Sequence, residues 1–584
     1  MATFAPSKYQ QKFFDELVNT DHNIVIEACA GSGKTTTIVQ SIGMVGSDKK
    51  ILVIAFNKSI ADELSSRLES HKNVRVKTLH GFGYGLLLGY MRGVKPQLDE
   101  YKYKTYVRES LHRLLNRKMY DKLGNEDKET LIANIVDCVN LARVYLCKNE
   151  GDVYNVLTKY ELPLSPDYLK TVLLVMNWGK TNLDTIDYTD MVWLPNALGI
   201  QNTRQRYDYV FIDECQDLNR AQHGLFMSAL KPSVGRFVAV GDRKQCIYTF
   251  AGGDEESFER IMKYENTVTL PLSITYRCAK EIVDVARGIV PTIEANPSNT
   301  TVGKIEQGVT FDEIADDSMV LCRAKNPLAK LYTYLLKRNK KCYIKGKEIG
   351  ASMIGSLVKC DHDYLHQDLS QKGVFYDLYC KLFSTIKEMS TARGMTIDRV
   401  VESATVQNMI DEIETLNIIA EGVNKKDELI RKINSIFLEN GEGIMLSTIH
   451  KAKGLEAERV YILGKSLLGG SNRALDWQIK EETCLEYVAY TRAKSYLGFL
   501  AESENKKAND DMSIFLKAVE KKILKLDNGL SPIDWNNDSS QQERIKRLDS
   551  KMEDGVFPSF GKTLYEKVNA KRSHVNEVES FWNL

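Results

Sequence analysis

The chain has 584 residues and lacks several features that would narrow its function at once. Its 79 Lys and Arg residues are balanced by 78 Asp and Glu residues, so a surface that binds a polyanion must be a local concentration of basic side chains. The 11 cysteines form no C-x-x-C pair and no cluster with His at metal-ligand spacing, which argues against zinc, iron–sulfur clusters and a secreted disulfide framework. Repeats of solenoid period and low-complexity tracts are missing too.

Long apolar segments are also absent from the sequence. No run of about 18 apolar residues occurs, as a membrane-spanning helix would require. The N-terminal sequence MATFAPSKYQQ has no basic stretch followed by an apolar one, so no signal peptide is expected. We therefore expect a cytosolic or nuclear protein without membrane contact. Because 43% of its residues are hydrophobic and 27% are charged, the chain can bury several cores and should form several domains.

Short runs rich in Val and Ile recur along the chain, each followed by turn residues and a stretch of helical periodicity. This pattern is typical of parallel sheets flanked by helices. A first set of expected strands comprises residues 23–27, 50–56, 74–80, 209–214 and 236–242, and a second set comprises residues 318–323, 340–346, 443–450, 459–464 and 495–501. Segments 85–185 and 352–440 have no such runs but carry residues at helical spacing, so each set is expected to contain a mainly helical insertion.

A phosphate-binding loop is predicted after the first strand. NIVIE runs into ACAGSGKT (residues 28–35) and then into a helical TTTIVQS. In such a loop the backbone N–H groups and the helix N-terminus hold phosphates, Lys34 would bridge phosphate oxygens, and the hydroxyl group of Thr35 would bind Mg²⁺. The motif alone could be an ordinary glycine-rich loop, and Ala28 stands where the generic pattern has Gly. Its position between a buried strand and a helix favours a nucleoside triphosphate site.

The acidic end of a second strand indicates the reaction. YVFIDE (residues 209–214) is an apolar strand that ends in two acids and is followed by CQD. Asp213 could hold Mg²⁺, and Glu214 could orient and deprotonate the attacking water. A lone pair of acids after a strand is often only a solvated turn, but a P-loop in the same sheet makes that interpretation the weaker one. A glutamate beside the Mg²⁺ ligand favours water over a kinase's acceptor, and therefore ATP hydrolysis.

From residue 7 to about residue 494, the order of motifs resembles the superfamily 1A DNA helicases of the UvrD/Rep/PcrA family. SKYQ (7–10), ACAGSGKT, AFNKSIADEL (55–64) and TLHGF (78–82) are similar to the family's Q motif, its P-loop, which also begins with Ala, and its motifs Ia and Ib. DECQD (213–217) and VGDRKQCIYTFAGGD (240–254) are similar to motifs II and III. LSITYRCAKEI (272–282), STIHKAKGLEAERV (447–460) and LEYVAYTRAK (485–494) are similar to motifs IV, V and VI, with Thr275 where the family usually has Asn.

The resemblance implies roles for individual residues at an ATP site. Gln10 would read the adenine edge and Tyr276 would stack on adenine, whereas Glu456 would hold the ribose. Gln245 would sense the γ-phosphate, Arg277 would reach it, and Arg492 would be the arginine finger. The expected nucleotide-binding set is Gln10, Ala30, Gly31, Ser32, Gly33, Lys34, Thr35, Thr36, Tyr276, Arg277, Gly454, Glu456 and Arg492. The expected catalytic set is Lys34, Asp213, Glu214, Gln245, Arg277 and Arg492, with Thr35 and Asp213 as metal ligands.

The resemblance also implies a path for single-stranded DNA. The expected DNA-binding residues are Phe56, Asn57, Lys58, Thr78, His80, Phe82, Tyr248, Phe250, Thr448 and His450. Phe250 is expected to stack on a base, because an aromatic residue at this position of motif III does so in the family and stacking binds single strands without sequence choice. The alternatives are that Tyr248 and Phe250, which alternate at strand spacing, fill a core, and that His80 and His450 are structural.

Together these patterns predict an α/β protein with two tandem RecA-like parallel-sheet domains of the P-loop NTPase class, each with an inserted helical subdomain. The expected boundaries are 1–84 and 186–275 around the insertion 85–185, then 276–351 and 441–530 around the insertion 352–440, and a tail at 531–584. ATP would lie between the two domains, so that hydrolysis removes the charge that holds them together.

The expected function is that of an ATP-dependent and Mg²⁺-dependent DNA helicase or translocase, acting on single strands and single/double-strand junctions as a monomer. The family implies movement from 3′ to 5′. Replication or repair proteins could bind through the C-terminal tail. One alternative is a translocase that displaces bound proteins with little unwinding, and another is a nucleic-acid-binding scaffold with residual ATPase activity. Lys34, Glu214, Arg277 and Arg492 argue against a scaffold, but motor residues do not separate a helicase from a translocase.

Overall fold

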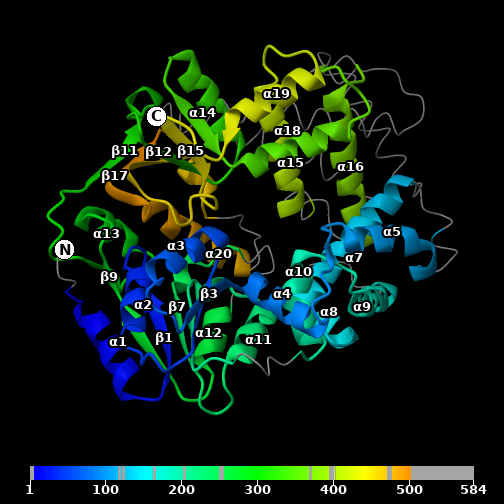
Figure 1. The fold of residues 1–584 in the computed structure, drawn as a ribbon. Helices are drawn as coiled ribbons and strands as arrows, with labels where there is room; N and C mark the ends of the chain where they lie inside the picture. Colours follow the sequence, from blue (N-terminus) through cyan, green and yellow to red (C-terminus); the bar gives the residue numbers. More distant parts are fainter. Residues whose placement is uncertain are drawn as a thin grey trace. The chain divides into compact units, whose positions relative to one another are not determined.

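The computed structural model describes residues 5–115, 120, 125–160, 162, 166–200, 206–248, 256–366, 371–393, 400, 403–469 and 476–501. The chain forms two compact units (Figure 1). The first comprises Met1–Glu306, Ala452–Val460 and Leu468–Gly498, and the second comprises Gln307–Lys451, Tyr461–Leu467 and Phe499–Leu584. Among the described residues, none of the helices has the length and apolar character needed to traverse a lipid bilayer.

The first unit is built on a six-stranded parallel sheet. In spatial order its strands are β3 (Val74–Thr78), β2 (Ile51–Ala55), β6 (Tyr209–Ile212), β7 (Arg236–Gly241), β1 (Asn23–Ala28) and β8 (Thr267–Leu272). The five strands expected from Val and Ile runs are all present. Strand β8 was not expected, because Pro271 interrupts its apolar pattern. Proline is tolerated there because β8 is an edge strand and the outer side of an edge has no hydrogen bonds to lose.

Side chains alternate between the two faces of this sheet, as the period of two in a strand requires. Ile24 and Ile26 of β1 join one buried cluster, whereas Val25 joins another. Helices α1 (Lys8–Asn19), α2 (Lys34–Ile42) and α3 (Lys58–Arg67) cover the first face, and α4 (Leu79–Tyr90), α11 (Arg220–Ala229) and α12 (Ser257–Met262) cover the second. Both faces are therefore buried, which explains the continuous apolar runs of β2 and β7.

The segment between β3 and β6 is mainly helical, as its periodicity predicted. It contains β4 (Gln97–Leu98), α5 (Lys102–Leu114), α7 (Asn125–Val144), α8 (Glu150–Lys159), α9 (Pro166–Thr181), β5 (Thr185–Ile186) and α10 (Tyr188–Ala197). These helices enclose an apolar core of their own, in which Val139, Val172 and Trp193 are fully buried. The exact limits of an inserted subdomain stay a prediction.

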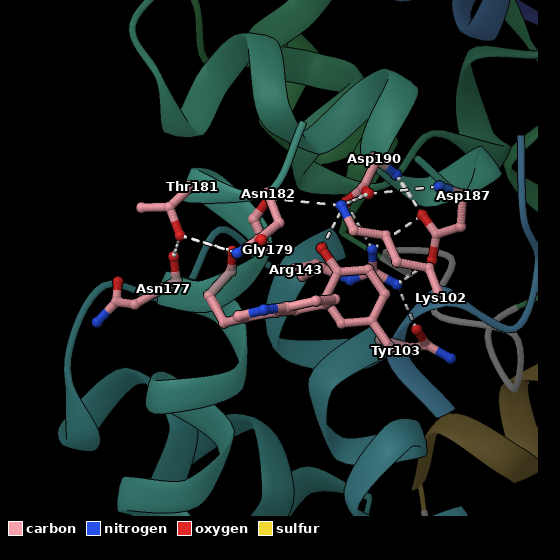
Figure 2. Close-up of polar contacts among 11 residues, drawn as sticks. Lys102, Tyr103, Arg143, Asn177, Gly179, Thr181, Asn182, Asp187 and Asp190 are labelled. Atoms are coloured by element: carbon pink, nitrogen blue, oxygen red, sulfur yellow. Dashed lines mark hydrogen bonds and ion pairs between the residues drawn. The ribbon is translucent and has the colours of Figure 1, made fainter. Parts of the chain in front are cut away.

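A buried network of charges joins α5 and α7 to the start of α10 (Figure 2). The guanidinium group of Arg143 makes two hydrogen bonds to the Asp187 carboxylate, at 2.9 and 2.7 Å, and one of 2.8 Å to Asp190 Oδ1. Asp190 also accepts from Lys102 Nζ at 2.7 Å and from Tyr103 Oη at 2.6 Å. The two acids form the capping box of α10. Because two cations meet two anions, the network is neutral and its charges are paired within the core.

The second sheet has seven strands. In spatial order they are β11 (Lys304–Val309), β17 (Ala493–Leu500), β16 (Ala457–Leu463), β12 (Met319–Cys322), β15 (Ile444–Thr448), β13 (Cys342–Lys345) and β14 (Phe437–Leu438). The pairs β12–β15, β13–β15 and β13–β14 are parallel. The five expected strands are again present, and two parallel sheets confirm the α/β fold. Strand β11 was missed because KIEQGV has no apolar run, and β14 because it has only two residues.

Further helices accompany this sheet. They are α14 (Asn326–Lys337), α15 (Lys347–Val358), α16 (Val374–Arg393), α18 (Ala404–Ile419) and α19 (Lys426–Ile436). The segment 352–440 thus has the helical character that its sequence predicted. Residues 452–460 and 468–498, which the sequence pattern assigned to the second domain, belong to the first compact unit, and they bring the later part of motif V and all of motif VI into it.

Candidate active site

The phosphate-binding loop joins β1 to α2 in the predicted strand–loop–helix arrangement. Gly31 and Gly33 have φ angles of +71° and +78°, in the left-handed region that favours glycine. A Cβ atom at Gly31 would lie 2.6 Å from both Arg277 Cβ and Thr275 Oγ1, so the loop also needs glycine for space. Thr275, the departure from the usual motif IV, therefore packs directly against the loop.

The Lys34 side chain meets the acids at the end of β6. Its Nζ atom lies 2.6 Å from Glu214 Oε1. Although burial by itself lowers the pKa of Lys34, the charges of Glu214, Asp213 and Asp242 raise it above its ordinary value. Burial, with the neighbouring Glu214 charge, raises the pKa of Asp213. The structure thus brings together the lysine and the two carboxylates that the sequence assigned to catalysis.

Glu214 has an ionised side chain and a rare backbone conformation. Burial raises its pKa, but Lys34 and Lys453 more than offset this effect, so the pKa lies below its ordinary value and the carboxylate is ionised. Its φ of +53° is rare for a residue with a Cβ atom and costs about 1–3 kcal/mol. Such strain persists only where neighbouring structure fixes the turn, and it is common at functional sites.

A chain of hydrogen bonds runs from Glu214 to Gln245. Gln216 Nε2 donates to Glu214 Oε2 at 2.5 Å, and Gln216 Oε1 accepts from the backbone N–H of Asp242 at 3.0 Å. Asp242 Oδ2 then accepts from Gln245 Nε2 at 2.7 Å. Gln216 was not among the predicted site residues, although it is part of the DECQD segment that is similar to motif II. Motifs II and III are therefore physically connected.

The two predicted arginines lie in the same compact unit as the P-loop. Arg492 follows α20 (Asp476–Tyr490) and is 1% exposed. It donates to Leu455 O at 3.1 Å, to Val488 O at 3.0 Å and to Gln245 Oε1 at 3.5 Å. Burial, together with the charge of Arg277, lowers the pKa of Arg492 to about 9. Arg492 therefore contacts Gln245, the residue that the resemblance predicts to sense the γ-phosphate.

The residues predicted to hold the nucleoside form a second group. Arg277 Nε donates to Glu456 Oε2 at 2.6 Å. Tyr276 is 44% exposed and its backbone N–H donates to Gly31 O at 2.8 Å. Gln10 Nε2 donates to Thr37 Oγ1 at 2.9 Å, and Gln10 Oε1 accepts from Tyr276 Oη at 3.5 Å. The predicted adenine-reading residues therefore contact one another beside the P-loop.

The remaining loop residues have varied environments. Ala30 N–H donates to Tyr487 Oη of motif VI at 3.0 Å, and Thr36 Oγ1 accepts from an arginine at 3.5 Å. Thr35 is half-buried in the first turn of α2, and Gly454 is exposed with a φ of +86°. Ser32 Oγ is buried and has no hydrogen-bond partner among the described residues. A buried hydroxyl group of this kind fits a polar ligand in the loop.

Magnesium requires few protein ligands, since it keeps several waters and binds through one or two carboxylates plus phosphates. Within the described ranges, no group of three or more His, Cys, Asp and Glu side chains could hold a metal ion alone. A hydroxyl group at Thr35 and a buried carboxylate at Asp213 suit the Mg²⁺ of a nucleotide complex. They do not suit a metal held by protein side chains alone.

Two of the predicted strand-binding residues form a stacked pair. The rings of Phe56 and Tyr248 lie 6.1 Å apart at an interplanar angle of 19°, and Phe56 is 41% exposed. Lys453 Nζ lies 5.1 Å from the Tyr248 ring centroid and 5.9 Å from that of Phe56. The same ammonium group pairs with Asp217 and donates to Gln245 O at 2.7 Å. Lys453 was missed by the residue assignments, although motif V contains it.

The other predicted strand contacts have mixed positions. Asn57 and Thr78 cap α3 and α4 through bonds to backbone N–H groups at 2.9 and 3.1 Å, and Lys58 is exposed. His80 is half-buried, and burial lowers its pKa. Phe82 is only 4% exposed within the core beneath the sheet. Its contact with DNA stays a prediction.

Two further predicted DNA contacts lie in the second compact unit. Thr448 ends β15 in the second unit, pairs with Cys322 of β12 and is 8% exposed. His450 follows two residues later and is half-buried. Phe250 lies outside the described residues. Contact of all three with DNA stays a prediction.

Comparison with known proteins gives two family matches. The model of the UvrD/REP helicase N-terminal domain matches residues 10–265, and that of the UvrD-like helicase C-terminal domain matches residues 361–504. F-box DNA helicase protein 1 of Schizosaccharomyces pombe is 24% identical over 531 residues, which cover 84% of this chain and 56% of that protein. DNA helicase II of Escherichia coli is 24% identical over 296 residues, or 46% of this chain and 38% of that protein.

A shorter relative matches over nearly its whole length. Gabija protein GajB of Bacillus cereus is 21% identical over 553 residues, which cover 88% of this chain and 99% of that protein. By contrast, the chain spans about half the length of the F-box relative and less of the Escherichia coli one.

Proposed function

The chain belongs to the UvrD/Rep family of helicases, and we propose from this membership and from the site geometry that it is an ATP-driven motor on single-stranded DNA. The proposed reaction is DNA-stimulated hydrolysis of ATP in the presence of Mg²⁺. The proposed work is stepping along one strand, from 3′ to 5′, and opening of the duplex at a single/double-strand junction. The residues of motifs I to VI carry this reaction.

The buried guanidinium group of Arg492 is the observation that supports the proposal most directly. Among the described residues it meets neutral oxygen atoms, and burial lowers its pKa to about 9. A buried charge with neutral acceptors is costly unless an anion compensates it. A polyphosphate would supply that anion beside Gln245, and the P-loop offers the buried Ser32 hydroxyl group and the Lys34 ammonium group to the same ligand.

The chain's own residues suit hydrolysis by water. Lys34 and the backbone N–H groups of the loop would bind phosphate oxygens, and Thr35 and Asp213 would hold Mg²⁺, which neutralises phosphate charge when bound. The ionised Glu214 would orient the attacking water and accept its proton. Gln216 fixes one Glu214 carboxylate oxygen, at 2.5 Å, so that the base keeps a single orientation.

The stacked pair of Phe56 and Tyr248 provides a platform for bases. Aromatic stacking contributes about 1–3 kcal/mol per base in proteins that bind single strands. Lys453 contacts these rings and also Asp217 and Gln245, so one side chain connects the platform to the hydrolytic residues. We propose that Phe250, in the same motif, adds a second platform. Phe250→Ala should keep appreciable ATP hydrolysis and lose unwinding, whereas Phe250→Trp should retain both.

The proposal is tested by ATP hydrolysis measured with and without single-stranded DNA or RNA, and by unwinding of duplexes with 3′ or 5′ tails. We expect stimulation by DNA, unwinding of the 3′-tailed duplex, and loss of both activities in Glu214→Gln. Glu69→Gln, an exposed acid of the same unit, is the matched control and should behave as the parent protein. Binding of DNA without any hydrolysis in the parent protein would favour the scaffold alternative. Hydrolysis with displacement of bound proteins but no unwinding would favour the translocase.

A further inference from the structure

Behind the strained turn of Glu214 lies a buried chain of hydrogen bonds that none of the sequence motifs predicted. Ser257, the first residue of α12, is 0% exposed, and His223 of α11 is 2% exposed. Ser257 Oγ lies 2.7 Å from the backbone carbonyl oxygen of Cys215, and His223 Nε2 lies 2.8 Å from Ser257 Oγ. We propose that Ser257 and His223 are positioning residues for the catalytic turn, an inference that rests on the proposed ATP hydrolysis.

The direction of these hydrogen bonds follows from the atoms involved. A carbonyl oxygen only accepts, so the single hydroxyl proton of Ser257 goes to Cys215 O. Ser257 Oγ can then only accept from His223, which requires the proton of the neutral imidazole to sit on Nε2. The chain is thus a fixed relay from His223 to Ser257 to Cys215. No other placement of the protons allows both hydrogen bonds to form.

The carbonyl group at the end of this relay lies between two residues of the hydrolytic apparatus. Cys215 follows Glu214, which has the left-handed backbone, and precedes Gln216, whose amide group holds the Glu214 carboxylate. Because a peptide plane moves as one body, a shift of the Cys215 carbonyl group would turn Gln216 and loosen the strained residue before it. The relay therefore holds the general base without touching the substrate.

Both anchor helices are firmly held. Phe226 of α11 and Phe258 and Ile261 of α12 are fully buried in the core under the sheet. Arg243 adds an ion pair with Glu259 of α12 at 3.1 Å. The nucleoside-binding residues Gln10 and Tyr276 belong to other elements, so loss of the relay should change the chemical step more than ATP binding.

The test measures kcat and KM for ATP in Ser257→Ala, His223→Leu and the double variant, with saturating single-stranded DNA. We expect each single variant to lower kcat about tenfold, the effect of roughly one lost hydrogen bond. The KM for ATP should stay within about twofold of the parent value, because the Glu214 carboxylate acts in the chemical step and not in ATP binding. The double variant should lose no more than either single variant, because both act through one carbonyl group. His223→Gln, whose amide N–H can replace Nε2–H, should recover most of the rate.

The control is Ser228→Ala in α11, which removes a hydroxyl group that donates to a backbone carbonyl at 2.6 Å in the same helix as His223. It should keep the parent kcat, and its melting temperature shows what loss of such a bond does to stability alone. A parent-like kcat in Ser257→Ala, or losses that multiply in the double variant, would overturn the positioning role. The positioning role would also be overturned if Ser228→Ala lost as much kcat as Ser257→Ala for the same drop in melting temperature. Absence of turnover in the parent protein would instead overturn the proposed function, and the inference with it.

Discussion

Replacement of Arg143 tests how the first helical segment is held together. The side chain of Arg143 is fully buried, makes three hydrogen bonds to Asp187 and Asp190, and stacks at 3.8 Å on the Tyr103 ring. Arg143→Met keeps most of the volume and removes the charge. Asp190 retains Lys102 and Tyr103 as donors, but Asp187 loses its charged partner. Breaking a buried pair on one side costs about 3–5 kcal/mol, because an uncompensated charge remains.

The chain offers a matched control in an exposed ion pair between α5 and α7. Arg108 of α5 makes two hydrogen bonds to Glu129 of α7, at 2.9 and 2.7 Å, but these side chains are 51% and 53% exposed. Such surface pairs contribute about 0–1 kcal/mol in spite of good geometry. Arg108→Met should therefore be nearly neutral. The comparison tests burial, since α7 takes part in both pairs and the donor group and the bond lengths are alike.

Native-state hydrogen exchange is the suitable assay, because it reports local opening in a chain of several domains. Amides of α5, α7 and the start of α10 should lose protection equivalent to about 3–5 kcal/mol in Arg143→Met and to less than about 1 kcal/mol in Arg108→Met. Arg143→Met combined with Asp187→Asn should recover part of the loss, since the unpaired anion is gone. Equal protection in the two single variants would refute the reasoning.

Three further predictions concern the active site. Lys34→Ala should abolish turnover while circular dichroism stays unchanged, because a loop ammonium group supports no core; parent-like turnover would refute the P-loop assignment. Arg492→Ala should lower turnover by roughly 10³-fold or more and leave single-strand affinity nearly unchanged; equal losses of both would indicate a structural role. Lys453→Met should move the acidic limb of the kcat–pH profile to higher pH, because Glu214 loses one of the charges that lower its pKa. Lys451→Met, which removes an exposed lysine of the same motif, should leave that limb in place, and an unmoved limb in both variants would contradict the assigned base.

The sheets were predictable where their strands are buried on both faces. Strands β2 and β7 are continuous apolar runs because helices cover both sides, and such runs are visible in the sequence. Strand β8 contains Pro271, and β11 (KIEQGV) contains charged and polar residues among its few apolar ones. Both are edge strands, which need less apolar surface than central strands. Periodicity alone could not find them, because their pairing depends on neighbours far away in the chain.

The motif residues came together largely as predicted. Lys34 contacts Glu214, and Gln245 contacts Arg492, although more than 150 residues separate the partners in each pair. Motif spacing could not show that Phe82 faces inward, because the buried face of α4 is decided by packing against the sheet. Neither could it show the role of Ser257, since a lone serine at a helix start is common and its partner is a backbone carbonyl group.

Movement along a strand is the central claim, and transit times on single-stranded DNA test it most directly. The protein is bound to oligodeoxythymidine of increasing length with a fluorophore at the 5′ end, and ATP is added with a trap for free protein. Directed stepping from 3′ to 5′ predicts that the delay before the fluorescence change grows in proportion to length, and that Glu214→Gln gives no change. Rapid ATP hydrolysis with a delay that does not depend on length would contradict the motor.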